Sequence, residues 1–344
     1  MFAAEVFAVA SIVFSGVQPQ LAAIGDRVYL VFGQGDVISV VRSSDGGETF
    51  DTPSSLPGSG KLALGMRRGP RIAATNDAVL VAAVAGAKGG GADGDVLLYR
   101  STDRGATWQA PVAINDVAGS AREGLHAMVA SPSGLVVVAW LDLRDTGTRI
   151  YAAVSRDHGA TWAPDSLVYA SPSGTVCECC HPSVAIGADG RVAIMFRNSL
   201  SGNRDIYLAE SKDGVTFTSA RKLGTASWAL NACPMDGGAV AFSADGVVST
   251  WRREGDVFLT TDRMPERRLG AGRDPVVAHF QTRRDLAWSA PDGVVLVRTG
   301  DAPLSLGRGR FPSLVALRDK TVIAWEHEGQ VMVKAVARRP GSGL

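Results

Sequence analysis

Residues 101–108, STDRGATW, recur three more times along the chain in nearly the same form. The other copies are SSDGGETF (43–50), SRDHGATW (155–162) and SKDGVTF (211–217), which is one residue shorter. Their aspartates, Asp45, Asp103, Asp157 and Asp213, are 58, 54 and 56 residues apart. Self-similarity at a near-constant period is typical of repeat architectures, and we call these four segments the repeat turns.

Each repeat turn has the composition of a tight turn between two strands. Ser and Asp side chains can bond neighbouring backbone amides, and Gly adopts the positive φ that such a turn requires. The closing Trp or Phe can pack beneath the turn as an apolar plug. Apolar runs such as VISVV (37–41) and IYAAV (150–154) precede the turns, and two further strand-like runs lie before each. The repeated module is therefore four strands, with the repeat turn before the last one.

The strand rhythm continues beyond the last repeat turn, so the sequence predicts an all-β β-propeller of four-stranded blades. Seven blades are favoured over six by counting. The predicted units, all within one domain spanning 1–344, are 18–56, 67–114, 121–169, 177–223, 233–269, 273–306 and 309–337. The last unit has only three strand-like runs. The apolar run near residues 6–14 can supply its fourth strand, which would close the ring and remove exposed sheet edges.

The charge balance and the amino-terminal segment exclude several classes of partner. Lys and Arg total 35 against 34 Asp and Glu, without a basic or acidic block, so nucleic acid and membrane surfaces are not expected partners. The apolar run from residue 6 to 17 is shorter than the roughly 20 residues of a membrane-spanning helix, and we expect no membrane insertion. It also lacks the basic start of a signal peptide. We still expect a periplasmic or secreted protein, because an exported protein accommodates clustered cysteines as disulfides.

The repeat turns resemble Asp boxes, the bacterial-neuraminidase repeats of the sialidase superfamily. Residues 69–114 resemble an opening sialidase blade, in which an Arg-Ile-Pro motif precedes a strand and the first Asp box. This chain has Arg71, Ile72 and Ala73 there, so the proline of the motif is missing. The resemblance covers residues 18 to about 223 clearly and implies the propeller fold. It implies function more weakly, because function lies in sites and not in folds.

A working sialidase, as the resemblance implies, needs three arginines on a carboxylate, a Tyr nucleophile activated by a Glu, and an Asp acid. Only Arg71 can be assigned by motif, as a candidate carboxylate-binding residue. The nucleophile should come from a late blade, yet the last tyrosine is Tyr207. Tyr151 and Tyr207 occupy matching places in successive units, which predicts a packing role. The remaining candidate arginines are expected to be solvated loop charges: Arg197, Arg204, Arg252 and Arg253. A catalytic sialidase is therefore disfavoured, and the catalytic residues are unknown.

The four cysteines fall in two segments. Cys177, Cys179 and Cys180 lie in TVCECCHPSV (175–184), directly before His181, and Cys233 lies in LNACPMDGG (230–238). Aligning the first strand of each unit places both segments in loops that lead into inner strands, at one mouth of the channel. The same alignment brings further polar residues to that mouth: His126, Arg71, Asp236 and Asp274. We predict the two histidines as further metal ligands and the other three as a ligand pocket.

Three interpretations of the cysteines compete. A Cys-x-Cys-Cys cluster with a neighbouring His offers soft ligands for copper or zinc, and a cation would relieve the repulsion between crowded thiolates. Alternatively, Cys233 bridges to one of the other three, and closing a loop of about 54 residues would contribute roughly 4 kcal/mol in the chain-entropy model. The third interpretation is a redox-active thiol or an exchangeable pair.

The sequence thus favours a sialidase-like propeller that binds copper or zinc through its cysteine-rich loop. One alternative is an exo-glycosidase acting on acidic sugars, and another is a disulfide-stapled scaffold for a ligand or a protein partner. The expected partners are a metal ion or a small-molecule or carbohydrate ligand. If the protein is an enzyme, we expect a sialidase-type glycoside hydrolase or a metal-dependent activity.

Overall fold

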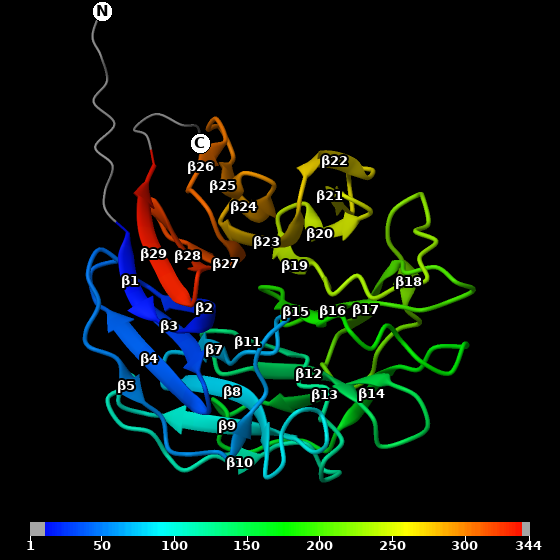
Figure 1. The fold of residues 1–344 in the computed structure, drawn as a ribbon, viewed down its shortest axis with the longest axis horizontal. Coiled ribbons are helices and arrows are strands. Elements are labelled where there is room, and N and C mark those ends of the chain that lie inside the picture. The colour runs from blue at the N-terminus through cyan, green and yellow to red at the C-terminus, as the bar shows by residue number, and fades with distance from the viewer. Residues whose placement is uncertain (1–10, 339–344) are drawn as a thin grey trace, which may run out of the picture.

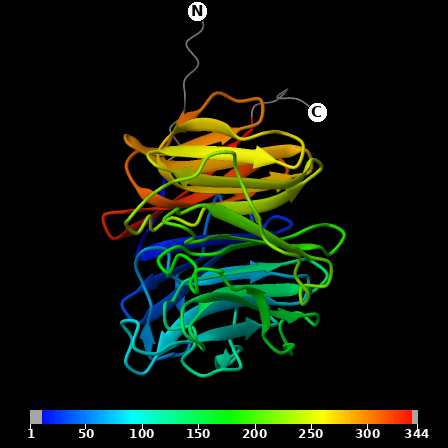
Figure 2. The same ribbon diagram turned by 90° about the vertical axis from the view of Figure 1, so that its right-hand side faces the viewer.

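Seven antiparallel sheets form a ring around a central channel in the computed structural model, which describes residues 11–338 (Figure 1). Neighbouring inner strands contact one another all the way round the ring. Seen from the side, the strands run roughly along the short axis of the molecule (Figure 2). The prediction of a seven-bladed β-propeller is confirmed.

Each sheet is one blade, and the strands are numbered along the chain. The inner strands of blades one to seven are β2 (Val17–Ile24), β7 (Arg71–Ala74), β11 (His126–Ala130), β15 (Ser183–Ile186), β19 (Ala239–Ser243), β23 (Arg273–Phe280) and β27 (Arg310–Ala316). The second strands are β3 (Arg27–Gln34), β8 (Val79–Gly86), β12 (Val136–Asp142), β16 (Val192–Arg197), β20 (Gly246–Arg253), β24 (Arg283–Ala290) and β28 (Lys320–His327).

The outer half of each blade completes the sheet. The third strands are β4 (Val37–Ser43), β9 (Asp95–Ser101), β13 (Arg149–Ser155), β17 (Ile206–Ser211), β21 (Asp256–Thr261), β25 (Gly293–Arg298) and β29 (Gln330–Ala337). The outermost strands are β5 (Ser54–Ser55), β10 (Val112–Ala113), β14 (Ser166–Tyr169), β18 (Arg221–Lys222), β22 (Arg267–Ala271), β26 (Leu304–Ser305) and β1 (Ile12–Ser15). Blade two has one extra short strand, β6 (Lys61–Leu62), which pairs with β8.

The two ends of the chain meet in blade seven. Strand β1 pairs antiparallel with β29, with Val13 opposite Met332 and Phe14 opposite Val331. This confirms the predicted ring closure by an amino-terminal strand, although residues 6–10 of the predicted run lie outside the described residues. Closure joins the sheet of the last blade to the start of the chain, so the ring is held by backbone hydrogen bonds at its seam.

The hydrophobic core is divided among the gaps between blades. Seven clusters of buried side chains each span one pair of neighbouring blades. Second strands are covered on both faces, which explains continuous apolar runs such as VVVAWLD (136–142), where every residue is buried. Within residues 11–338 there is no helix long and apolar enough to cross a bilayer.

The repeat turns follow the third strands of blades one to four and share one hydrogen-bond network. In blade three, Ser155 Oγ donates to Asp157 Oδ1 (2.7 Å), while Thr161 donates its backbone N–H to Oδ1 (2.9 Å) and its hydroxyl to Oδ2 (2.6 Å). The closing aromatic side chains, Phe50, Trp108, Trp162 and Phe217, each pack against the cluster shared with the preceding blade. Each repeat turn thus packs against the preceding blade through its closing aromatic side chain, in the role that the sequence predicted for it.

Candidate metal centre and channel mouth

The channel mouth is formed by the loops that lead into the seven inner strands, which we call the mouth loops. Blades one, six and seven share the pattern Gly-x-x-Pro there: GVQP (16–19), GRDP (272–275) and GRFP (309–312). The residue before each proline has a positive φ: 59° for Gln18, 54° for Asp274 and 53° for Phe311. Non-glycine residues rarely hold this conformation, and such strained residues concentrate at functional sites.

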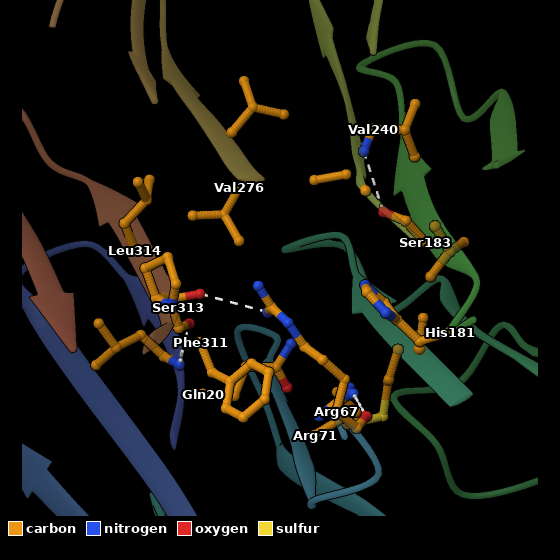
Figure 3. A pocket seen from close by; sticks show the side chains of 18 of the residues that line it. Gln20, Arg67, Arg71, His181, Ser183, Val240, Val276, Phe311, Ser313 and Leu314 are labelled. Carbon is orange, nitrogen blue, oxygen red and sulfur yellow. Dashed lines mark hydrogen bonds between the residues drawn. The ribbon is translucent and has the colours of Figure 1, made fainter. Parts of the chain in front are cut away.

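A cavity of about 170 Å³ occupies the centre of this mouth. Figure 3 shows the Arg67 side chain extending into it, with His181 on one side and Phe311 and Ser313 on the other. Arg67 donates from Nη2 to the Asp274 carbonyl oxygen (2.9 Å) and from Nη1 to the Pro312 carbonyl oxygen (3.4 Å). It therefore ties the loop of blade two to blades six and seven. Sequence reasoning missed Arg67, whose one signal was the adjacent pair of arginines before Gly69.

The side chains of Arg71 and His126 form hydrogen bonds with backbone carbonyl oxygens. Arg71 donates from Nε to the His126 carbonyl oxygen (3.1 Å), from Nη1 to the Gly69 carbonyl oxygen (2.8 Å) and from Nη2 to the Arg67 carbonyl oxygen. Burial, with the nearby Arg67, lowers the pKa of Arg71 to about 9. Arg71 lines the cavity, but each of its three guanidinium nitrogens already has a carbonyl acceptor.

His126 is fully buried in the same wall. Its Nδ1 lies 3.2 Å from the Gly124 carbonyl oxygen and its Nε2 lies 3.2 Å from the Ala82 carbonyl oxygen. Burial and the Arg71 charge lower its pKa to about 4, so the ring is neutral and donates to one of the two carbonyls. Its role as a metal ligand stays a prediction that this geometry does not favour.

Asp236 and Asp274 brace neighbouring mouth loops. Both are buried, and Asp236 Oδ2 accepts the backbone N–H of Asp274 (2.7 Å), while Asp236 Oδ1 accepts that of Gly238 (3.2 Å). Burial and the nearby Asp236 carboxylate raise the pKa of Asp274 to about 6. Neither residue lines the cavity.

The mouth loop of blade four, residues 170–182, gathers three thiols. The Sγ–Sγ distances are 3.7 Å for Cys177 and Cys179, 3.6 Å for Cys177 and Cys180, and 3.9 Å for Cys179 and Cys180. Cys177 and Cys180 are buried, whereas Cys179 is partly exposed. Among the described residues, these three are the one group of at least three His, Cys, Asp or Glu side chains whose ligand atoms all lie within 4.8 Å of one another. We call it the thiol triad.

Local backbone contacts fold the loop so that the thiols converge. The Cys177 N–H donates to the Arg197 carbonyl oxygen (3.1 Å), and the Cys180 N–H turns back to the Cys177 carbonyl oxygen (3.4 Å). The hydrogen bond with Cys179 raises the pKa of Cys177 to about 11, and burial raises that of Cys180 to about 12. Without a cation the thiols therefore stay protonated at neutral pH.

Arg197 lies beside the triad and is fully buried, which corrects the expectation of a solvated loop charge. Its guanidinium donates to the carbonyl oxygens of Asp236 (3.0 Å), Arg204 (2.6 Å) and Arg252 (2.9 Å). These acceptors lie in the mouth loop of blade five, in the segment between β16 and β17, and near the end of β20. The three carbonyl oxygens need hydrogen-bond donors, which explains why this arginine is buried. Within residues 11–338, no carboxylate oxygen lies within 4.0 Å of it.

Cys233 and His181 do not join the triad. Cys233 is exposed and free in the mouth loop of blade five, and its Sγ is outside the group of ligand atoms. His181 lines the cavity, where its buried Nδ1 has no hydrogen-bond partner in the described structure, and burial holds its pKa well below the usual value. The structure thus brings together three of the six metal ligands that the sequence suggested.

The tyrosines named in the sequence occupy packing positions. Tyr207 stacks on Phe196, with ring centroids 6.3 Å apart, and Tyr151 lies under the Arg144 guanidinium at 3.9 Å. Within the described residues, the lining of the central cavity includes no tyrosine and no carboxylate. It therefore offers neither the Tyr nucleophile of a sialidase nor the carboxylate pair of other glycosidases.

Comparison with known proteins supports the fold. The model of a BNR repeat-like domain matches residues 23–174 and 73–248. A Dyadobacter fermentans protein of unknown function superposes with a TM-score of 0.59 at 17% identity, covering 94% of this chain and 95% of that one. No curated protein matches the chain.

Two further solved structures are carbohydrate-processing propellers. A Penicillium chrysogenum α-L-arabinanase complexed with arabinobiose has a TM-score of 0.54 at 14% identity, covering 96% and 95% of the two chains. A leech intramolecular trans-sialidase has a TM-score of 0.57 at 9% identity, covering 98% of this chain and 69% of that one. At these identities the likeness is one of fold.

Proposed function

The chain belongs to the family of BNR repeat-like domains, and on that premise we propose that it is a metal-binding propeller whose thiol triad holds one cuprous ion. The observation that carries the proposal is the convergence of three sulfurs within 3.9 Å of one another. A metal at about 2.3 Å from each of three thiolates requires sulfur separations of roughly 3.8–4.0 Å. The triad needs little movement to reach them.

The chemistry of the donor set favours copper(I) over zinc. Thiolates are soft ligands, which suit Cu(I), and three of them complete a trigonal site. Structural zinc is almost always four-coordinate, and the described structure places no fourth protein ligand within reach of the triad.

The surroundings supply the countercharge for such a centre. Three thiolates and one Cu(I) carry a net charge of −2, which is costly to bury alone. The positive charge of the Arg197 guanidinium favours the thiolate forms of Cys177 and Cys180. Its hydrogen-bond acceptors are carbonyl oxygens, not carboxylates. A buried cation that has no carboxylate partner among residues 11–338 can balance the charge of an anionic cluster beside it.

The other hypotheses have less support. A scaffold with two disulfides would need Cys233 beside one of the triad sulfurs, and Cys233 stands outside the group. A glycosidase would need a nucleophile or an acid in the cavity, whose described lining provides neither.

A titration with Cu(I) tests the proposal. We expect the reduced, anaerobically purified full chain to take up one equivalent in competition with bicinchoninate and to develop thiolate-to-copper absorption in the ultraviolet. The double variant Cys177→Ser/Cys180→Ser should lose this equivalent, and Cys233→Ser is the matched control that should keep it.

X-ray absorption on the copper-loaded wild type keeps the test independent of the variants. A first shell of three sulfur atoms supports the triad. A shell of nitrogen and oxygen, or a loss of copper in Cys233→Ser as large as in the double variant, would overturn the proposal. Purification with one triad cysteine already joined in a disulfide to Cys233 would do the same.

A further inference from the structure

A second polar cavity, of about 520 Å³, lies between blades one and two, at the face of the ring opposite the channel mouth. Strand β2 starts at the mouth, so β3 starts and β4 ends at the far face, where the repeat turn of blade one follows. The cavity is lined there by Arg27, Tyr29, Arg42, Ser44, Phe50 and Arg104, among others. We propose that this cavity binds the doubly charged oxyanion group of a phosphate monoester. The proposal is independent of the thiol triad.

The register of blade one places three of these side chains on one face. Tyr29 of β3 is directly opposite Arg42 of β4, and Arg27 precedes Tyr29 by two residues, so all three point to the gap between blades one and two. Arg104, from the repeat turn of blade two, closes the cavity from the other side. The side chain of Arg42 lies beneath that turn, against Gly105.

The donors in the cavity are free for a ligand. The side chains of Arg27 and Arg104 are exposed, and within residues 11–338 they form no ion pair and no hydrogen bond. Arg42 uses only Nε on its Asp51 partner (2.7 Å), which leaves its two terminal nitrogens. Tyr29 is 2% exposed, and its hydroxyl has no acceptor in the described part of the chain. Burial raises the pKa of Tyr29, and the positive charges of Arg27, Arg104 and Arg42 act on it in the opposite direction.

The net charge of the residues that line this cavity indicates the charge of its ligand. Three arginines and Asp51 give a net charge of +2, which matches a dianion. Guanidinium groups bind tetrahedral oxyanions through paired N–H donors, and a phenol adds a further donor. The Asp45 carboxylate in the same turn is committed to Ser43 and Thr49 and does not line the cavity.

The other blades provide an internal comparison. In the gap between blades two and three, the positions of Arg27, Tyr29 and Arg42 are taken by Ala78, Leu80 and Arg100. Arg100 Nε donates to the His158 carbonyl oxygen (2.9 Å). His158, which replaces Arg104, contacts Thr75 Oγ1 (2.9 Å) and Asp77 (3.2 Å). That gap is closed by partners within the protein, whereas in the first gap, among residues 11–338, the guanidinium groups of Arg27 and Arg104 and the terminal nitrogens of Arg42 have no partner.

Calorimetric titration with inorganic phosphate tests the proposal, with chloride at equal ionic strength as the blank. We expect one site, weakened about tenfold by Arg27→Gln/Arg104→Gln and about threefold by Tyr29→Phe. The matched control is Arg191→Gln/Arg263→Gln, which removes the same charge from exposed arginines elsewhere, and it should leave affinity unchanged.

Further titrations identify the source of the oxyanion. Glucose 6-phosphate binding more tightly than inorganic phosphate assigns the cavity to a phosphate ester whose body contacts Phe50. Binding of 4-nitrophenyl sulfate, a monoanion, as tightly as glucose 6-phosphate would contradict a site built for a dianion. Absence of any heat above the chloride blank, or equal weakening by the control pair, would overturn the proposal.

Discussion

The repeat turns and the mouth loops lie at opposite ends of the same blades, and they differ in what the blades share. Four repeat turns use one network of Ser, Asp and Thr, with the Ser hydroxyl 2.7–2.8 Å from the Asp carboxylate in every copy. The mouth loops differ more from one another: one carries the thiol triad, two neighbouring ones hold the buried residues Asp236 and Asp274, and another carries Arg67. Repetition therefore builds the ring, and the thiol triad lies in a mouth loop that the other blades do not repeat.

The two ends also differ in how deeply their polar groups are buried. The Asp side chains of the repeat turns are solvated and bond within their own turn, whereas Arg197 at the mouth is 1% exposed and bonds three other segments. If this contrast is correct, substitutions at the mouth will destabilise the protein far more than substitutions in a repeat turn.

Replacing Arg197 with Met gives the largest expected effect. The change removes a buried charge-assisted donor set and leaves the carbonyls of Asp236, Arg204 and Arg252 without it, so we expect a loss on the order of 3–5 kcal/mol in the free energy of unfolding. Urea denaturation followed by tryptophan fluorescence measures it. Arg191→Met is the control at the other end of β16, where a 43% exposed arginine should matter by less than about 1 kcal/mol. Similar losses in the two variants would remove the distinction between the mouth and the opposite face of the ring.

Acid sensitivity of the repeat turns gives an intermediate effect. Hydrogen bonding from Thr49, in its side chain and its backbone, lowers the pKa of Asp45 to about 2. Its ordinary pKa is close to 4, so its contribution is complete above pH 4 and is lost as the pH falls from about 4 to about 2. We expect Asp45→Asn to cost roughly 0.5–1 kcal/mol at pH 6, because the turn is exposed.

The measurement is the urea midpoint at pH 6, 4 and 2.5 for the wild type and for Asp45→Asn. The two midpoints should converge as the pH falls, because the wild-type carboxyl becomes protonated. A constant difference at all three values would show that the Asp45 charge is not what the turn uses.

The sequence was sufficient for the fold because the information is local and repeated. An Asp followed within two residues by a Gly marks each turn, and apolar runs long enough to be covered on both faces, such as VAIMF in β16, mark the second strands. The thiol triad was also predictable, because Cys177, Cys179 and Cys180 belong to one short loop. Arg197 and Arg67 were not, because most of their acceptors are carbonyls of other blades, and only the assembled ring brings those carbonyls to them.

Replacing Cys233 gives the smallest expected effect on stability. It also tests the burial of the thiol triad, because the sequence placed Cys233 with the triad and the structure leaves it exposed and free. The thiolate is the reactive form of cysteine. A pKa of about 11 for Cys177 and about 12 for Cys180 should make these thiols on the order of a hundredfold slower toward Ellman's reagent than an ordinary exposed one. We expect one fast-reacting thiol in the metal-free reduced protein, none in Cys233→Ser, and a change in unfolding free energy within about 0.5 kcal/mol. A fast thiol that survives Cys233→Ser would mean that the triad is open to solvent, and the buried anionic centre proposed for copper would lose its basis.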